Sequence, residues 1–150
     1  MRGFWFLVHF VGFTLWLGGG IASMVAGVTA KSFAPAERLA VYRAVGRIHR
    51  LLVAPGALFV VISGMVLLVP LMRAGAMPPS LNAMMGAGLL GAIVALFFSV
   101  PTAGRLSRLT VDARGELPEA FAGLRKKQAI VATIAGALAI VALVAGTVVR

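Results

Sequence analysis

Two histidines are the side chains best suited to chemistry in this 150-residue chain. His9 lies about five residues inside a long run of apolar residues, which places it roughly 8 Å deep in a helix that rises 1.5 Å per residue. An imidazole in hydrocarbon needs a hydrogen-bond partner or a ligand. Two interpretations of His9 therefore stay open: it binds a ligand, or it is satisfied by a carbonyl of a neighbouring helix or by Thr147.

Methionine thioethers are the other metal donors, because the chain has no cysteine. Met84 is expected at about the depth of His9, on the same helix face as Gly88 and Gly91. A His/Met pair suits a haem iron, and thioethers beside imidazole also suit Cu(I). The alternative for Met84 is packing, since methionine often fills gaps between apolar helices. The residues predicted for a copper site are His9, Met77, Met84 and Met85.

Three further side chains complete the predicted haem site. Trp16 follows His9 by two helical turns on the same face, so it is expected to form an aromatic wall beside a flat ligand such as haem b or a porphyrin. Arg2 and Arg73 are expected at the same membrane surface, where a guanidinium can pair with a propionate. The sequence therefore predicts cofactor binding by His9, Trp16, Met84, Arg2 and Arg73.

His49 is interpreted differently, because it stands between Arg47 and Arg50 at the end of an apolar run. This position favours a basic cluster at the membrane surface. Since His9 and His49 are expected on opposite sides of the membrane, the sequence disfavours one haem held by both.

Several kinds of chemistry are excluded by composition. The absence of cysteine excludes disulfides, thiolate zinc sites and iron–sulfur clusters. All four acidic residues lie outside the apolar runs, which argues against a carboxylate proton relay and against paired-carboxylate hydrolysis. The sequence assigns no catalytic residue and leaves enzymatic activity open.

Four uncharged runs define the elements that must position these side chains. The chain is 61% hydrophobic and 12% charged, with a mean hydropathy of +1.02. The runs contain 28, 22, 31 and 22 residues, each more than the roughly 20 that a helix needs to cross a bilayer. The sequence predicts an all-α fold, a single four-helix domain over 1–150 with up-down-up-down topology. The predicted spans are about 4–27, 50–72, 81–101 and 128–149.

The cations predict an orientation. Eleven of the fourteen Lys and Arg residues fall in two segments, 31–50 and 105–127, while the others are Arg2, Arg73 and Arg150. Because short cytoplasmic loops are enriched in Lys and Arg, both termini are expected outside. The pI near 11.9 is explained by anionic lipids at the cytoplasmic face rather than by nucleic acid. A cleaved signal peptide is the alternative for the N-terminus, but the uncharged stretch runs on to Ala30 and five cations follow it, which favours an anchor.

Small residues are expected to bring the four helices together, since lipid provides no hydrophobic gain for pairing. The predicted contact stripes are Gly12, Gly19 and Ser23, then Gly56 and Ser63, then Gly88, Gly91 and Ala95, and finally Ala129, Ala132, Gly136, Ala139, Ala142 and Gly146. Segments 36–49 and 118–127 are expected to extend the second and fourth spans, with Pro35 and Pro118 near their first turns. Pro55 should kink its helix or mark its start, and Ser80 or Asn82 should cap the third helix.

The first 70 residues or so carry a motif pattern. It consists of His9-x6-Trp16-x-Gly18-Gly19, a loop with Arg43, Arg47 and Arg50, and a second span with Pro55-Gly56 and Ser63-Gly64. This pattern resembles small bacterial four-helix membrane families, including the copper-resistance CopD-like proteins and the HemJ-type protoporphyrinogen oxidases.

Each resemblance implies a function. The resemblance to HemJ-type proteins implies a b-type haem in the bundle with His9 as the first-helix ligand, although this chain lacks the further histidines and the third-span lysine of that pattern. The resemblance to CopD-like proteins implies copper handling at a bacterial inner membrane. A third hypothesis is a non-catalytic membrane scaffold, a homo-oligomer or a subunit of a larger membrane complex. All three predict a multi-pass protein of the inner (cytoplasmic) membrane.

Overall fold

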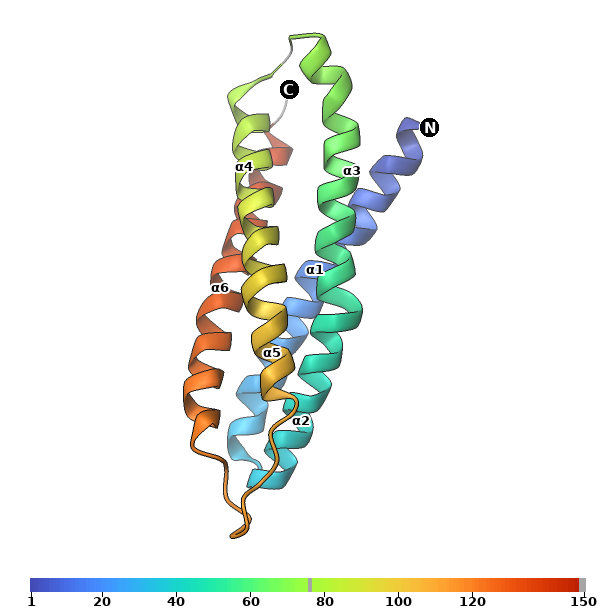
Figure 1. The fold of residues 1–150 in the computed structure, drawn as a ribbon. Coiled ribbons are helices and arrows are strands. Elements are labelled where there is room, and N and C mark those ends of the chain that lie inside the picture. Colours follow the sequence, from blue (N-terminus) through green and yellow to red (C-terminus); the bar gives the residue numbers. More distant parts are fainter. Residues whose placement is uncertain (76, 149–150) are drawn as a thin grey trace.

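The structure, a computed structural model, describes residues 1–75 and 77–148 and is helical throughout, with no strand in these two ranges. Val149, at the end of the predicted fourth span, and Arg150 lie outside the described residues. In chain order the elements are α1 (Arg2–Thr29), η1 (Ala30–Ser32), α2 (Pro35–Ile48), η2 (His49–Val53), α3 (Ala54–Arg73), α4 (Pro79–Val94), η3 (Ala95–Ser99), α5 (Val100–Leu106) and α6 (Ala120–Thr147). They form an elongated bundle (Figure 1).

Four continuous helical segments are long and apolar enough to cross a membrane: Arg2–Ser32, Pro35–Arg73, Pro79–Leu106 and Ala120–Thr147. Only 17–28% of the residues in their most apolar stretches are buried within the protein. The rest of these apolar surfaces faces outward, which a bilayer satisfies and water does not. The predicted all-α bundle of four membrane-spanning helices is therefore confirmed, and the chain is an integral membrane protein.

The helix starts follow the prolines, with two corrections. α2 begins at Pro35, as predicted, and the Ala34 N–H donates to the Glu37 carboxylate over 3.2 Å. α6 begins at Ala120, two residues later than expected from Pro118. The prediction that Ser80 or Asn82 caps the third helix is wrong: α4 starts at Pro79, and its N-cap is Pro78, which has no side-chain hydrogen bond. Proline suits the first turn because its missing N–H has no intrahelical partner there.

α1 and α3 cross through direct backbone contact at two glycines. A Cβ atom on Gly12 would lie 2.9 Å from the Gly56 carbonyl oxygen, and a Cβ on Gly56 would lie 2.6 Å from the Trp16 amide nitrogen. Side chains larger than hydrogen do not fit at these distances. The predicted stripe on the first helix is confirmed, since its buried residues are Gly12, Trp16, Gly19 and Ser23.

The bundle consists of two closely packed helix pairs, α1 with α3 and α4 with α6. Trp16 joins the pairs: a Cβ on Gly91 of α4 would lie 3.0 Å from the end of the Trp16 ring and 3.1 Å from the Cβ of Leu138 on α6. The buried residues of α6 are Phe121, Gln128, Ala135, Ala139 and Ala142. The predicted stripe is therefore correct at Ala139 and Ala142 and one position off at Ala129 and Gly136.

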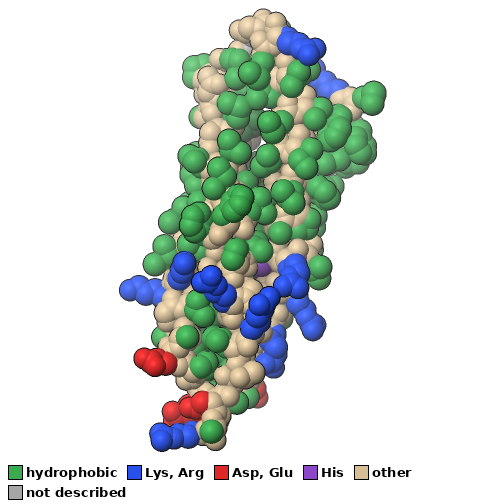
Figure 2. Space-filling view, in the orientation of Figure 1, with side chains coloured by type: hydrophobic (Ala, Val, Ile, Leu, Met, Phe, Trp, Pro, Cys, Tyr) green, Lys and Arg blue, Asp and Glu red, His purple; other side chains and the backbone are tan. Residues whose placement is uncertain are grey.

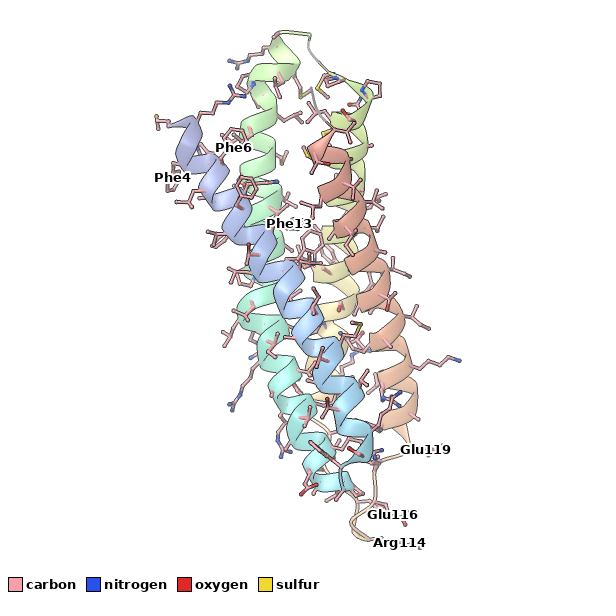
Figure 3. All side chains as sticks on the ribbon, turned by 180° about the vertical axis from the view of Figure 1, so that it is seen from behind. Phe4, Phe6, Phe13, Arg114, Glu116 and Glu119 are labelled. Atoms are coloured by element: carbon pink, nitrogen blue, oxygen red, sulfur yellow. The ribbon has the colours of Figure 1, made fainter. Side chains whose placement is uncertain are left out.

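The first turns of α1 stand away from the other helices (Figures 1 and 3). Phe4 and Phe6 are 61% and 42% exposed there, whereas Phe13 packs against the core. Most of the Lys and Arg side chains visible on one face gather over its lower part, below a broad hydrophobic surface, and a few lie at the upper end (Figure 2). We call the end of the bundle with the 31–50 and 105–127 segments the basic end.

Candidate functional site

A cluster of four buried polar side chains lies toward the basic end of the bundle. We call it the inner cluster: Ser23, His49, Ser99 and Gln128, which are 8%, 1%, 2% and 6% exposed. Each comes from a different membrane-spanning segment. A polar group in this environment is costly unless it is hydrogen-bonded, so four converging groups mark a specified site.

The hydrogen bonds of His49 fix its tautomer. Nδ1 lies 3.0 Å from the Val45 carbonyl oxygen and 3.3 Å from the Ser23 hydroxyl oxygen. Because the carbonyl only accepts, Nδ1 carries the proton and donates it. Nε2 then accepts from the Gln128 amide nitrogen, 2.9 Å away. His49 is thus a neutral imidazole held from both sides.

Gln128 is incompletely satisfied. Its amide nitrogen donates to His49 Nε2 and to the Ser99 hydroxyl, both over 2.9 Å. Its amide oxygen is buried and has no hydrogen-bond partner among the described residues. A buried acceptor without a donor costs on the order of 1–3 kcal/mol. The inner cluster therefore contains one acceptor, the amide oxygen of Gln128, that receives no hydrogen bond from the described residues.

Two π-helical turns position the cluster. η2 begins at His49 and η3 ends at Ser99, and each is followed after one residue by a proline, Pro55 or Pro101. The Ala54 N–H donates to the carbonyl five residues back, and the Val100 N–H does the same. Such turns insert an extra residue and are frequent at functional sites. Pro55 is the second residue of α3 and lies inside the continuous helical segment Pro35–Arg73, so the prediction that it marks the start of its span is wrong.

The interpretation of His49 as part of a surface basic cluster is wrong. Its neighbours Arg47 and Arg50 are exposed, but the imidazole is turned into the bundle. The signal that could have revealed the cluster is the set of polar residues in otherwise apolar runs. In the prediction from sequence, Ser23 and Ser63 count only as small residues in helix contacts, and Ser99 and Gln128 have no role.

His9 has a simpler environment in the other half of the bundle. It is half-buried on α1, and its Nδ1 lies 3.0 Å from the Ser63 hydroxyl oxygen on α3. The Ser63 hydroxyl donates to the Phe59 carbonyl, so it accepts from His9. Nδ1 is therefore the protonated nitrogen and Nε2 keeps its lone pair. The predicted alternative partner Thr147 donates to the Val144 carbonyl instead.

Gly64 makes room for the His9 ring. A Cβ atom at this position would lie 3.4 Å from Cε1 of His9, within close van der Waals contact. The imidazole thus packs against α3, where Ser63 holds it through a hydrogen bond. A neighbouring helix therefore provides a hydrogen-bond partner for Nδ1 of His9 but not for Nε2, so neither interpretation of His9 is excluded.

The structure does not gather the other predicted site residues around His9. Met84 turns toward α6, where a Cβ on Gly146 would lie 3.0 Å from its sulfur. Trp16 packs against Gly91 in the core, and Met85 is 40% exposed. The remaining predicted residues are half-buried Met77 and exposed Arg2 and Arg73. Among the described residues no group of three or more His, Asp or Glu side chains could hold a metal ion.

The two histidines are far apart, as expected. His9 faces Ser63, whereas His49 contacts Ser23, fourteen residues farther along α1. At 1.5 Å per residue this separates the two sites by about 21 Å along the helix axis. One haem iron cannot bind both imidazoles.

Comparison of this chain with protein-family models, with curated proteins and with solved structures finds no significant match. The function is therefore argued from the geometry of the chain itself.

Proposed function

We propose that this integral membrane protein binds haem b, or a related porphyrin, with Nε2 of His9 as the axial ligand. The observation that carries the proposal is the hydrogen bond from His9 Nδ1 to Ser63. Metal-binding histidines commonly donate their other ring N–H in this way, which fixes the tautomer and orients the lone pair.

The surroundings of His9 suit a large apolar ligand better than those of His49. His9 is half-buried and its Nε2 makes no hydrogen bond with the described residues, whereas His49 is 1% exposed and already accepts from Gln128. Arg2 lies two helical turns from His9 on the same face of α1, about 10.5 Å along the axis. Its exposed guanidinium is available to a propionate.

This chain would hold a haem through one side chain, His9, rather than through two. The sulfur of Met84 lies against Gly146 of α6, while the imidazole of His9 lies against α3. We therefore assign Met84 to packing and expect a haem with a single protein ligand. Bound haem would supply one-electron chemistry, and the chain's own part is to orient the imidazole through Ser63.

The positive-inside rule supports an orientation with the basic end in the cytoplasm and the His9 end outside, in a bacterial inner membrane. In that orientation the haem would lie in the outer half of the bilayer. The haem site and the inner cluster would then occupy opposite leaflets.

Haem titration of the purified protein in mild detergent tests the proposal. The native chain and Met84→Leu are expected to develop a Soret band with equal affinity, because His9 is intact in both. His9→Gly is expected to lose the band, and free imidazole added to this variant is expected to restore it by taking the place of the missing side chain.

Circular dichroism and size-exclusion profiles of the three proteins serve as the fold control. Haem binding by His9→Gly that equals the native affinity would overturn the assignment of His9. A correctly folded native protein that binds no haem would remove the proposal and leave the copper-handling and membrane-scaffold hypotheses.

A further inference from the structure

A groove opens between α2 and α5 at the basic end, outside both histidine sites. Its volume is about 280 Å³, and it is lined by Gly46, Arg50, Val100, Pro101, Gly104, Arg105 and Arg108. Arg50 and Arg105 from two separate membrane-spanning segments, together with Arg108 two residues after α5, thus line one hollow, and none of the lining residues is acidic.

Two glycines shape the groove. At Gly46 the helices are in close contact, since a Cβ there would lie 2.5 Å from the Cβ of Ser107. Gly104 has the opposite role: no neighbouring heavy atom lies within 4 Å of a Cβ built on it. The helices therefore touch along one line and leave open space beside it.

The three arginines are available to a ligand. Within residues 1–75 and 77–148 none of them donates a hydrogen bond to a protein acceptor, whereas Arg38 donates to the carbonyl of Ala30 and Arg125 to the hydroxyl of Tyr42. Clustered guanidiniums without acidic partners repel one another, and an oxyanion relieves this repulsion through charge-assisted hydrogen bonds.

The groove also borders the apolar surface. Val100 and Pro101 form part of its wall, and Phe97, one helical turn before Pro101, is 70% exposed. On this face the cations lie directly below the broad hydrophobic surface (Figure 2). A ligand in the groove would have its anionic group at the arginines and could extend hydrocarbon over Phe97.

We propose that this groove binds the phosphate headgroup of an anionic phospholipid, with Arg50, Arg105 and Arg108 as the phosphate-binding residues and Phe97 in contact with an acyl chain. Basic pockets between membrane-spanning helices are a known setting for anionic headgroups. This site is independent of the haem proposal, because it shares no residue with the surroundings of His9.

Native mass spectrometry of the detergent-purified protein, titrated with cardiolipin or with phosphatidylcholine, tests the proposal. The native chain is expected to bind one cardiolipin more tightly than phosphatidylcholine. The triple variant R50Q/R105Q/R108Q is expected to bind cardiolipin about tenfold more weakly or worse, given the contribution of each juxtamembrane cation.

Two further variants separate the groove from general charge and from folding. R114Q/K126Q/K127Q removes the same number of charges from exposed residues outside the groove and is expected to bind as the native chain does. Gly104→Leu places an apolar side chain in the hollow without changing the charge and is expected to weaken cardiolipin binding, while its Cβ atom meets no neighbouring heavy atom within 4 Å.

Three outcomes would overturn the proposal. The first is equal weakening in both triple variants, which would assign binding to net charge alone. The second is undiminished binding in Gly104→Leu, which would place the lipid elsewhere. The third is complete displacement of cardiolipin by millimolar inorganic phosphate, which would make free phosphate the ligand.

Discussion

His9 and His49 differ in burial and in the number of their hydrogen-bond partners. His9 has one partner, Ser63, on one neighbouring helix, and is half-buried. His49 has partners on both ring nitrogens, lies among polar groups from all four membrane-spanning segments and is 1% exposed. In both rings Nδ1 donates and Nε2 holds the lone pair. The difference is that only the lone pair of His9 is free.

The two histidines thus have the same tautomer but different expected roles, one in stability and one in ligand binding. At His49 the lone pair accepts from Gln128, within a hydrogen-bonded network that also includes Ser23 and Ser99, so the residue is expected to contribute to stability. At His9 the lone pair is unused, so the residue is expected to contribute to ligand binding and little to stability. Four experiments sharpen or break this distinction.

The largest effect is expected for His49→Ala. This change opens a cavity and removes one of the two acceptors of the Gln128 amide, so we expect a loss of about 2–4 kcal/mol in the free energy of unfolding. His9→Ala is expected to cost less than about 1 kcal/mol, since hydrogen bonds between membrane helices contribute roughly 0.6 kcal/mol each. Unfolding by SDS titration in mixed micelles measures both. Equal losses in the two variants would refute the distinction.

Gly12→Ala is expected to damage the His9 half of the bundle. A Cβ there would collide with the backbone of α3, at a cost of about 1–3 kcal/mol, and would move Ser63 away from His9. Gly20→Ala on the same helix is the matched control, because a Cβ at Gly20 meets no neighbouring atom. The same SDS titration compares them, and an unchanged stability in Gly12→Ala would contradict the close helix contact.

Ser63→Ala is expected to act on ligand binding more than on stability. It removes the acceptor for His9 Nδ1–H, and loss of such a supporting hydrogen bond commonly weakens metal binding by about 10-fold or more. Haem titration followed at the Soret band measures the effect, with Ser23→Ala, which adjoins only His49, as the control. A haem affinity that falls in Ser23→Ala but not in Ser63→Ala would reverse the assignment of the two sites.

Gln128→Leu is expected to have the smallest effect. It removes two hydrogen bonds, worth roughly 0.6 kcal/mol each in a membrane, but it also removes the amide oxygen that has no partner. These contributions largely cancel, so the net loss should stay within about 1 kcal/mol in the SDS titration. A loss exceeding that of His49→Ala would mean that the glutamine, rather than the histidine, organises the inner cluster.

Much of the fold can be predicted from simple features of the sequence. The uncharged runs predict four membrane-spanning helices, and the spacing of Gly12, Trp16, Gly19 and Ser23 predicts the buried face of α1. Both predictions succeed because they depend on one regular helix at a time.

The inner cluster could not be predicted in this way. The π-helical turn that begins at His49 inserts a residue, so a projection at 100° per residue gives the wrong facing for the residues beyond it. Ser99 is the last residue of the second π-helical turn, Ala95–Ser99, so the same difficulty applies to it. In addition, the partners of His49 come from three other spans, and one sequence does not show which polar residues of different helices lie at the same depth. The position of Met84 against α6 could not be predicted for the same reason.

Carbethoxylation of the native protein by diethyl pyrocarbonate, followed by peptide mass spectrometry, tests the distinction between the two histidines most directly. The reagent requires an accessible, unprotonated imidazole nitrogen. We expect His9 to be modified in the folded protein and His49 to be modified only after unfolding in SDS. Modification of His49 at the same rate as His9 in the folded protein, or protection of His9, would contradict the account.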